Sequence, residues 1–161
     1  MKKKLLSCLL AAAMTFSAAS MGVSAATIHQ DSDPQSAVTQ ITTQVPISYT
    51  VTIPEDTTIA FEDTETDFGS VGLTAAQLEA GKSVTVTIQA GLLVNTDDSA
   101  KTIPYTVMAG EEEFTGAEYT AAGQSTDLTL AVAQDDWNKA YAGSYQGTVT
   151  FTIAYGDSTG A

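Results

Sequence analysis

The chain has 161 residues, with six lysines, no arginine and 19 carboxylates, which gives a net charge of −13. One domain is the default at this length, and a hydrophobic content of 43% excludes a wholly disordered chain. Three of the six lysines lie at positions 2–4, so a chain cleaved after them would carry −16. That negative field repels phosphate and anionic lipid headgroups, so we expect neither nucleic acid nor a membrane surface as a partner.

The first 25 residues follow the three-part pattern of an export signal. Three lysines precede an apolar run at 5–13, and Val23-Ser24-Ala25 places small side chains before a cleavage point at Ala26. The alternative is an uncleaved anchor helix, because the 21 residues at 5–25 are enough to cross a bilayer. We expect cleavage, export by the general secretory route, and an extracellular or cell-surface location without membrane insertion after cleavage.

Apolar and polar residues alternate between 41 and 53, the pattern of a half-buried strand. Pro46 has no amide hydrogen to donate, so this strand is expected to lie at a sheet edge or to break there. An edge strand can pair with the sheet of a neighbouring protein. The apolar positions proposed for such pairing are Ile41, Val45 and Ile47.

The same two-residue period recurs further along the chain. It covers 84–88, 103–107, 128–132 and 145–155, with weaker candidates at 58–61, 91–94 and 113–119. Seven or eight strands separated by turn residues predict an all-β sandwich or barrel. Threonine fills many of the polar positions, because its β-branched side chain suits a pleated sheet while its hydroxyl stays in water.

One or two short helical turns are expected between the strands. Thr74 and Gln77 have capping-box spacing, and Gly81 follows as a stop signal. A second turn at 135–140 starts with an aspartate and has Lys139 near its end, charges that suit the helix dipole. We divide the chain into a signal peptide (1–25), a flexible leader (26–36), a β-sandwich domain (37–155) and a flexible tail (156–161).

The sequence offers little for catalysis. The sole histidine, His29, lies in the leader, and the sole cysteine, Cys8, lies in the signal segment. The chain has no HExxH, GxSxG or glycine-rich phosphate loop. We therefore expect a protein that is not an enzyme and that has no cofactor.

Acidic clusters suggest calcium as an alternative ligand. The alternation at 63–67 resembles the start of an EF-hand loop, but the glycine and glutamate required at loop positions 6 and 12 are missing. We expect solvated loops, with an irregular calcium site as the alternative. Its candidate ligands are Asp63, Glu65, Asp67, Asp97 and Asp98.

Three aromatic residues raise the alternative of sugar binding. Tyr119, Trp137 and Tyr141 would form a platform on which cell-wall or host glycans stack. The competing interpretation, which we favour, places Trp137 as a hydrophobic plug at one end of the sandwich.

The closing run AGSYQGTVTFTI at 142–153 resembles the last strand of small secreted Gram-positive surface β-sandwich proteins. WxL-type domains and pilin-like or spore-coat-U-like subunits end in a similar way. The resemblance implies an immunoglobulin-like antiparallel sandwich with a surface role, and it assigns no functional residue.

These observations predict a secreted, non-enzymatic, surface-associated β-sandwich that acts as a structural or adhesive subunit. Its mechanism would be protein contact through edge strands, with other proteins or with further copies of itself. A carbohydrate-binding module and a calcium-stabilised spacer are the alternatives.

Overall fold

The computed structural model describes residues 27–31 and 35–160. The chain divides into two units, Met1–Thr43 and Gln44–Ala161. In the first unit, residues 27–31 and 35–43 form no helix or strand, and Val38 and Ile41 are almost fully exposed. The expected signal peptide at 1–25 lies outside the described residues.

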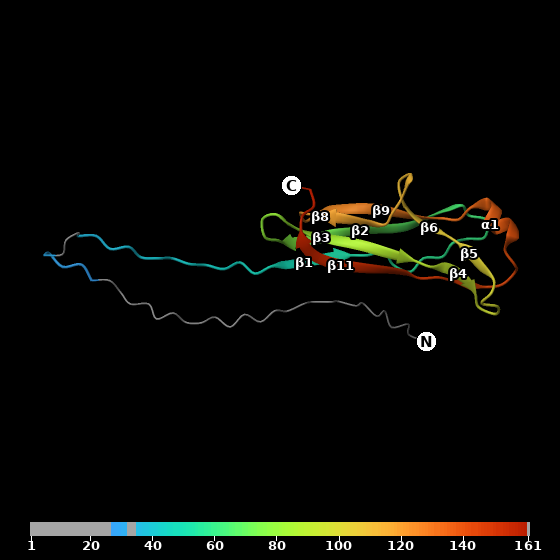
Figure 1. The fold of residues 1–161 in the computed structure, drawn as a ribbon, viewed down its shortest axis with the longest axis horizontal. Coiled ribbons are helices and arrows are strands. Elements are labelled where there is room, and N and C mark those ends of the chain that lie inside the picture. Colours follow the sequence, from blue (N-terminus) through green and yellow to red (C-terminus); the bar gives the residue numbers. More distant parts are fainter. Residues whose placement is uncertain (1–26, 32–34, 161) are drawn as a thin grey trace. The chain divides into compact units, whose positions relative to one another are not determined.

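The second unit is built from antiparallel strands and one short helix (Figure 1), which confirms the predicted all-β fold. Its described part contains eleven strands instead of seven or eight, because the expected strands at 103–107, 113–119 and 145–155 are each divided in two. The elements are β1 (Ser48–Thr52), β2 (Glu65–Gln77), β3 (Lys82–Ala90), β4 (Leu92–Asn95), β5 (Thr102–Pro104), β6 (Thr106–Ala109), β7 (Glu112–Glu113), β8 (Gly116–Tyr119), β9 (Gln124–Ala131), α1 (Gln134–Lys139), β10 (Tyr145–Gln146) and β11 (Val149–Asp157).

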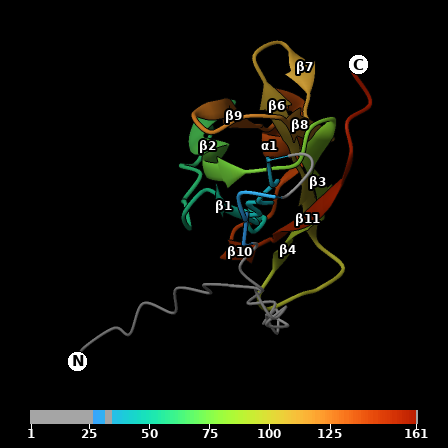
Figure 2. The same ribbon diagram turned by 90° about the vertical axis from the view of Figure 1, so that its left-hand side faces the viewer.

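The strands form the two facing layers of a sandwich. One layer is a five-stranded sheet in the order β1-β2-β9-β6-β7, and the other combines the sheets β11-β3-β8 and β10-β4-β5. Figure 2 shows β2 and β9 on one side and β3 and β11 on the other. The core lies between the layers, where Val71 and Leu128 meet Val84 and Val86 and all four are fully buried. Alternate side chains from both sheets thus fill the interior, as the two-residue period predicted.

Strand β2 differs most from the sequence prediction, because it takes in the expected helical turn. The prediction of a turn starting at Thr74 is wrong: Gln77 pairs with Ser48 of β1, and this long-range pairing overrides the local capping signal. At the other end, the register shifts between Asp67 and Gly69, where Gly69 has a φ of +93°. Such a bulge breaks the two-residue period by which a strand is recognised.

The strand predicted at 41–53 is shorter than expected. It begins two residues after Pro46 and ends at Thr52, opposite Gly72 of β2. It lies at the edge of its sheet, in agreement with the expectation from Pro46. Residues 53–64 form a loop, so the expected short strand at 58–61 is not formed. Because β1 stops at Thr52, β2 between 65 and 71 has a strand partner, β9, on one side only.

Helix α1 closes one end of the sandwich and matches the predicted turn at 135–140 within one residue. Its Trp137 is 9% exposed and packs with Ile103 and Val132 in a second core cluster. The indole N–H donates a hydrogen bond to the Asp63 carbonyl oxygen at 2.8 Å. Trp137 therefore occupies the plug position. Within residues 27–31 and 35–160, no helix has the length and hydrophobicity needed to cross a membrane.

The folded unit extends past residue 155. Strand β11 continues to Asp157, and the Ser158 amide donates to the Gly81 carbonyl oxygen at 2.9 Å. The Thr159 amide donates to the Glu118 carboxylate at 2.9 Å. Residues 156–159 therefore pair with the sandwich, where we expected a flexible tail.

Candidate functional site: the free edge of strand β11

Strand β11 forms one edge of its layer. It is nine residues long and pairs with β3 along its whole length, from Val149 opposite Ala90 to Asp157 opposite Lys82, without a register shift. On its other side it has no strand partner within the described part of the chain. Backbone N–H and C=O groups on that side are therefore left for an incoming strand.

The other outer edges carry features that discourage pairing. Strand β7 consists of two glutamates, and β8 has four residues including Glu118. Strand β1 follows Pro46 and faces a register shift in its partner. Short length, charged side chains, proline and bulges all hinder the pairing of an edge strand with another chain. Strand β11 has no proline and no bulge, and its single charge, Asp157, comes at its last residue.

The uncharged stretches of the sequence come together at this edge. Residues 34–54, 83–96 and 140–156 contain no charged side chain. They supply β1, β3 with β4, and β10 with β11 respectively. Strands β11 and β3 are paired, and Tyr49 of β1 stacks on Tyr155 of β11 with 6.1 Å between ring centroids. A strongly acidic protein thus presents an uncharged surface along β1 and β11.

The interior is incompletely covered at the middle of β11. Phe151 packs against Phe68 of the opposite layer at 6.3 Å, and Tyr155 packs against Tyr49. Ile153 lies between these two aromatic contacts and points to the same side as they do, because strand residues two apart share a face. It is nevertheless 40% exposed. An apolar side chain inserted beside Ile153 would complete the layer.

A groove lies beside Val149 and Phe151 of β11 and extends to Trp137 of helix α1. It has a volume of about 1340 Å³ and lies where β2 lacks an outer partner. Its walls are mainly apolar, and Glu55 and Asp56 are the only charged residues among those that line it. Its apolar lining includes Phe68, Leu93, Tyr105, Trp137, Tyr145 and Phe151.

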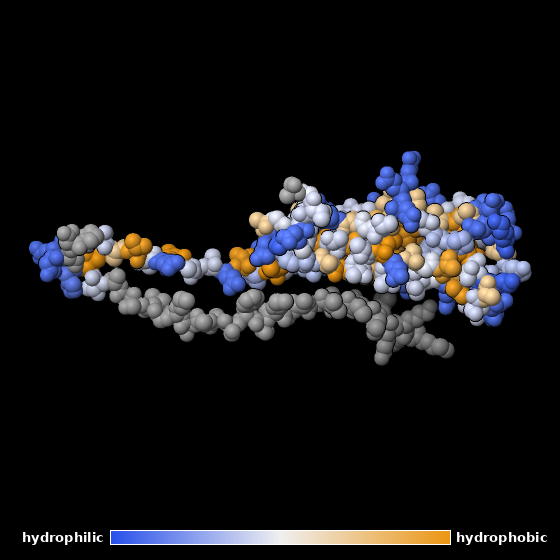
Figure 3. Space-filling view, in the orientation of Figure 1, coloured by the Kyte–Doolittle hydropathy of each residue, from blue (hydrophilic) through white to orange (hydrophobic). Residues whose placement is uncertain are grey.

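The segment before β1 exposes the residues that the sequence singled out for pairing. Ile41 is 92% exposed, Val45 is 61% exposed and Ile47 is 46% exposed. None of the three belongs to a strand. Figure 3 shows hydrophobic residues as orange patches along this segment. These apolar residues would share one face if the segment were extended.

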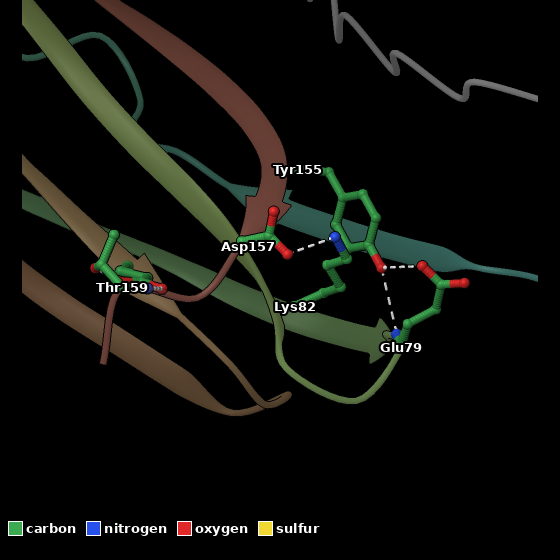
Figure 4. A network of polar contacts seen from close by, with 6 residues as sticks. Glu79, Lys82, Tyr155, Asp157 and Thr159 are labelled. Carbon is green, nitrogen blue, oxygen red and sulfur yellow. Dashed lines mark hydrogen bonds and ion pairs between the residues drawn. The ribbon is translucent and has the colours of Figure 1, made fainter. Parts of the chain in front are cut away.

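Polar contacts fix the far end of β11 (Figure 4). The Lys82 ammonium donates to the Asp157 carboxylate at 2.6 Å, and the hydrogen bond and charge of Asp157 raise the pKa of Lys82 above its usual 10.5. The Tyr155 hydroxyl donates to the Glu79 carboxylate at 3.2 Å and accepts from the Glu79 amide at 3.3 Å. The strand is therefore held in place where β3 begins.

A second contact joins the residues after β11 to β8. The Thr159 hydroxyl and amide both donate to the Glu118 carboxylate. The Thr159 hydroxyl first, then the Ser83 side chain, the Thr159 amide and the Ser158 side chain lower the pKa of Glu118 from its usual 4.5 to about 2. The end of β11 at Asp157 is thus tied both to β3 and, through Thr159, to β8.

The predicted acidic residues do not assemble into a metal site. Among the residues that the structure describes, no three histidine, cysteine, aspartate or glutamate side chains gather closely enough to hold an ion. Asp67 accepts a hydrogen bond from the Gly69 amide at 2.8 Å, and Asp98 accepts one from the Ala100 amide at 3.0 Å. The amides of Asp97 and Asp98 donate to the Asn95 side chain. These residues therefore stabilise local turns of the backbone.

The predicted aromatic platform is not assembled. Tyr119 is 3% exposed, and its hydroxyl donates to the Val71 carbonyl oxygen at 3.1 Å and lies 2.9 Å from the Thr126 hydroxyl. Burial raises the pKa of Tyr119. The platform role of Tyr119 is therefore wrong, since its ring faces the core. Tyr141 alone of the predicted three is largely exposed, with the Lys101 ammonium 4.1 Å from its ring centroid.

Two features of the site were missed by sequence analysis. Phe61 is 73% exposed and packs edge-on against Trp137 at 5.7 Å, and nothing in its surroundings in the sequence marks it. The β11 edge does have a sequence signal, because 17 residues, 140–156, pass without a single charge. A strand left uncharged on its polar positions has no protection against pairing.

Comparison with known proteins gives no family assignment. No protein-family model and no curated protein matches the sequence. Among solved structures, a chain from a chaperone–tip adhesin complex in the biogenesis of CFA/I fimbriae is similar, with a TM-score of 0.43 and 15% sequence identity. The similarity covers 70% of this chain and 43% of that one, so it spans less than half the length of the chain it matches.

Proposed function

We propose that this protein is an exported, non-enzymatic β-sandwich that serves as a structural or adhesive subunit at the cell surface. Its mechanism is protein contact through strand edges. The observation that carries the proposal is the exposed apolar segment at 38–47, which leads directly into the edge strand β1. The export pattern at 1–25 and the scarcity of catalytic residue types in the sequence support the location and the lack of enzymatic activity.

Exposure of Ile41, Val45 and Ile47 is unfavourable in water. Burying each side chain in a contact would contribute about 1.5–3 kcal/mol, as an upper bound, before the entropy of ordering the segment is subtracted. All three have odd residue numbers, so they share one face when the segment is extended. A partner sheet thus gains a strand whose inner face carries these three apolar side chains and whose outer face carries Gln40, Thr42 and Gln44.

A triple substitution tests this function. Ile41→Thr, Val45→Thr and Ile47→Thr keep β-branched side chains and remove most of the apolar surface. In cells that export the full chain, we expect the triple variant to move from the assembled or cell-associated fraction to free monomer, as seen by fractionation and light scattering. The matched control, Thr42→Ser with Gln44→Ser on the opposite face of the segment, should behave as wild type. Equal assembly and retention of a folded triple variant would contradict the proposal.

A further inference from the structure

We infer that strand β11 of one copy binds residues 38–47 of a second copy of this chain as an added strand, an inference that rests on the proposed function. The partner is thus the chain itself, and the receiving site is the β11 edge with the adjoining groove. Each copy has one segment to give and one edge to receive. Copies that bind in this way form an open head-to-tail polymer and not a closed two-fold dimer.

The backbone of β11 is ready for such pairing. Its nine residues are uninterrupted by proline or a register shift and are paired with β3 on one side only. Alternate N–H and C=O groups on the open side form a ladder template for another strand. The contacts from Asp157 and Tyr155 to the start of β3 hold this edge in place. The receiving strand is thus already in its bound form.

The side chains of the two surfaces also match. Phe151 and Tyr155 lie four residues apart and bracket the partly open position at Ile153. Ile41 and Val45 are likewise four residues apart, a distance of about 13 Å in an extended chain. An added strand with these residues on its inner face would cover Ile153 and reach the apolar groove beside Phe151.

Charge explains why two acidic copies can meet at this face. The whole chain carries −13, so most approaches between copies are repulsive. The giving segment falls within the uncharged stretch 34–54, and the receiving strand with its neighbour falls within 140–156 and 83–96. Contact through these stretches brings no carboxylate directly opposite another. The chain therefore has two uncharged surfaces that can bind each other, while its acidic remainder disfavours other contacts between copies.

Cross-linking between two copies tests the inference. The full chain with Cys8→Ser has no cysteine, so single cysteines can be placed freely. Thr42→Cys in one copy and Thr152→Cys in a differently tagged copy lie on the outer faces of the two strands. We expect a mixed disulfide or short-linker product from this pair. Thr120→Cys, which is exposed beyond β8, serves as the control and should give little product. Equal yields from Thr152→Cys and Thr120→Cys would overturn the inference.

A variant of the receiving edge provides the second measurement. Ile153→Lys places a charge inside the proposed contact, and Thr152→Lys places the same charge on the outer face. Because Ile153 is 40% exposed, Ile153→Lys should stay folded, with the wild-type circular dichroism and a somewhat lower urea midpoint, whereas Thr152→Lys should keep both. We expect Ile153→Lys to weaken self-association by about tenfold or more and Thr152→Lys to change it little. Unchanged self-association of a folded Ile153→Lys would refute the receiving site.

The outcomes separate this inference from the proposed function. If the segment variants lose surface retention while neither the cross-link nor the Ile153→Lys effect is seen, the segment binds another protein and the second-copy inference is wrong. If Thr42→Cys and Thr152→Cys join only when both are in one chain, the segment folds onto its own edge, and the inference is also wrong. If the segment variants change neither retention nor assembly, both proposals fail.

Discussion

Substitution of Trp137 distinguishes a structural plug from a sugar-binding ring. In Trp137→Ala, the loss of a ring that is only 9% exposed and packs with Ile103 and Val132 should lower the free energy of unfolding by about 3–5 kcal/mol. In Trp137→Phe, the ring is largely kept, but the Asp63 carbonyl oxygen loses its indole donor at 2.8 Å, which costs about 1–3 kcal/mol. The two variants therefore separate the contribution of packing from that of the hydrogen bond.

Urea unfolding followed by far-ultraviolet circular dichroism measures both variants. Trp137 is the sole tryptophan, so tryptophan fluorescence cannot follow the unfolding of variants that lack it. Tyr141→Ala is the matched control, because this ring is 62% exposed and its loss should cost under about 1 kcal/mol. If Trp137→Ala keeps the wild-type midpoint but abolishes binding on a glycan array, then the plug interpretation is wrong and the ring is a platform.

Two further predictions concern β3 and its neighbours. Gly116→Ala should destabilise the protein by about 1–3 kcal/mol in urea unfolding, because the added methyl group would lie 2.7 Å from the Val86 carbonyl oxygen. Gly156→Ala, with no atom within 4 Å of the new carbon, should be neutral or stabilising in the same measurement. Glu118→Gln should remove the part of the acid sensitivity that comes from this carboxylate. The lowered pKa means that Thr159 contacts stabilise the folded state above pH 4.5 and that this stabilisation is lost between pH 4.5 and about 2. The melting-temperature difference between wild type and Glu118→Gln should therefore shrink across that range, and a constant difference would contradict the assignment.

The sequence predicted those strands whose period is unbroken. Val84 and Val86, like Leu128 and Leu130, alternate with polar residues and prove to be buried in facing layers. In contrast, β2 was missed because a bulge at Gly69 shifts the alternation by one residue. Local spacing cannot reveal such a shift, since the bulge depends on pairing with β9, more than fifty residues away in the chain.

The candidate site was predictable only in part. Ile41, Val45 and Ile47 were identified from alternation, and the structure leaves them exposed. The burial of Tyr119 depends on its contact with Val71, 48 residues away, and a tyrosine in the sequence is equally compatible with a surface position. The edge position of β11 likewise follows from the order of strands in the sheet. Both the burial of Tyr119 and the edge position of β11 are determined by contacts between distant parts of the chain, which no local pattern reveals.

The positions where the chain enters and leaves the sandwich determine how it would respond to mechanical force. Ser48 at the start of β1 pairs with Gln77, and Asp157 at the end of β11 pairs with Lys82, just across the short β2–β3 turn. Force applied between these two points would separate β1 from β2 by breaking their backbone hydrogen bonds one after another. Force applied along a strand paired with β11 would instead act on all the hydrogen bonds between the two strands at the same time. The same fold would thus yield easily to a pull on its own two ends and resist one transmitted through a chain of subunits.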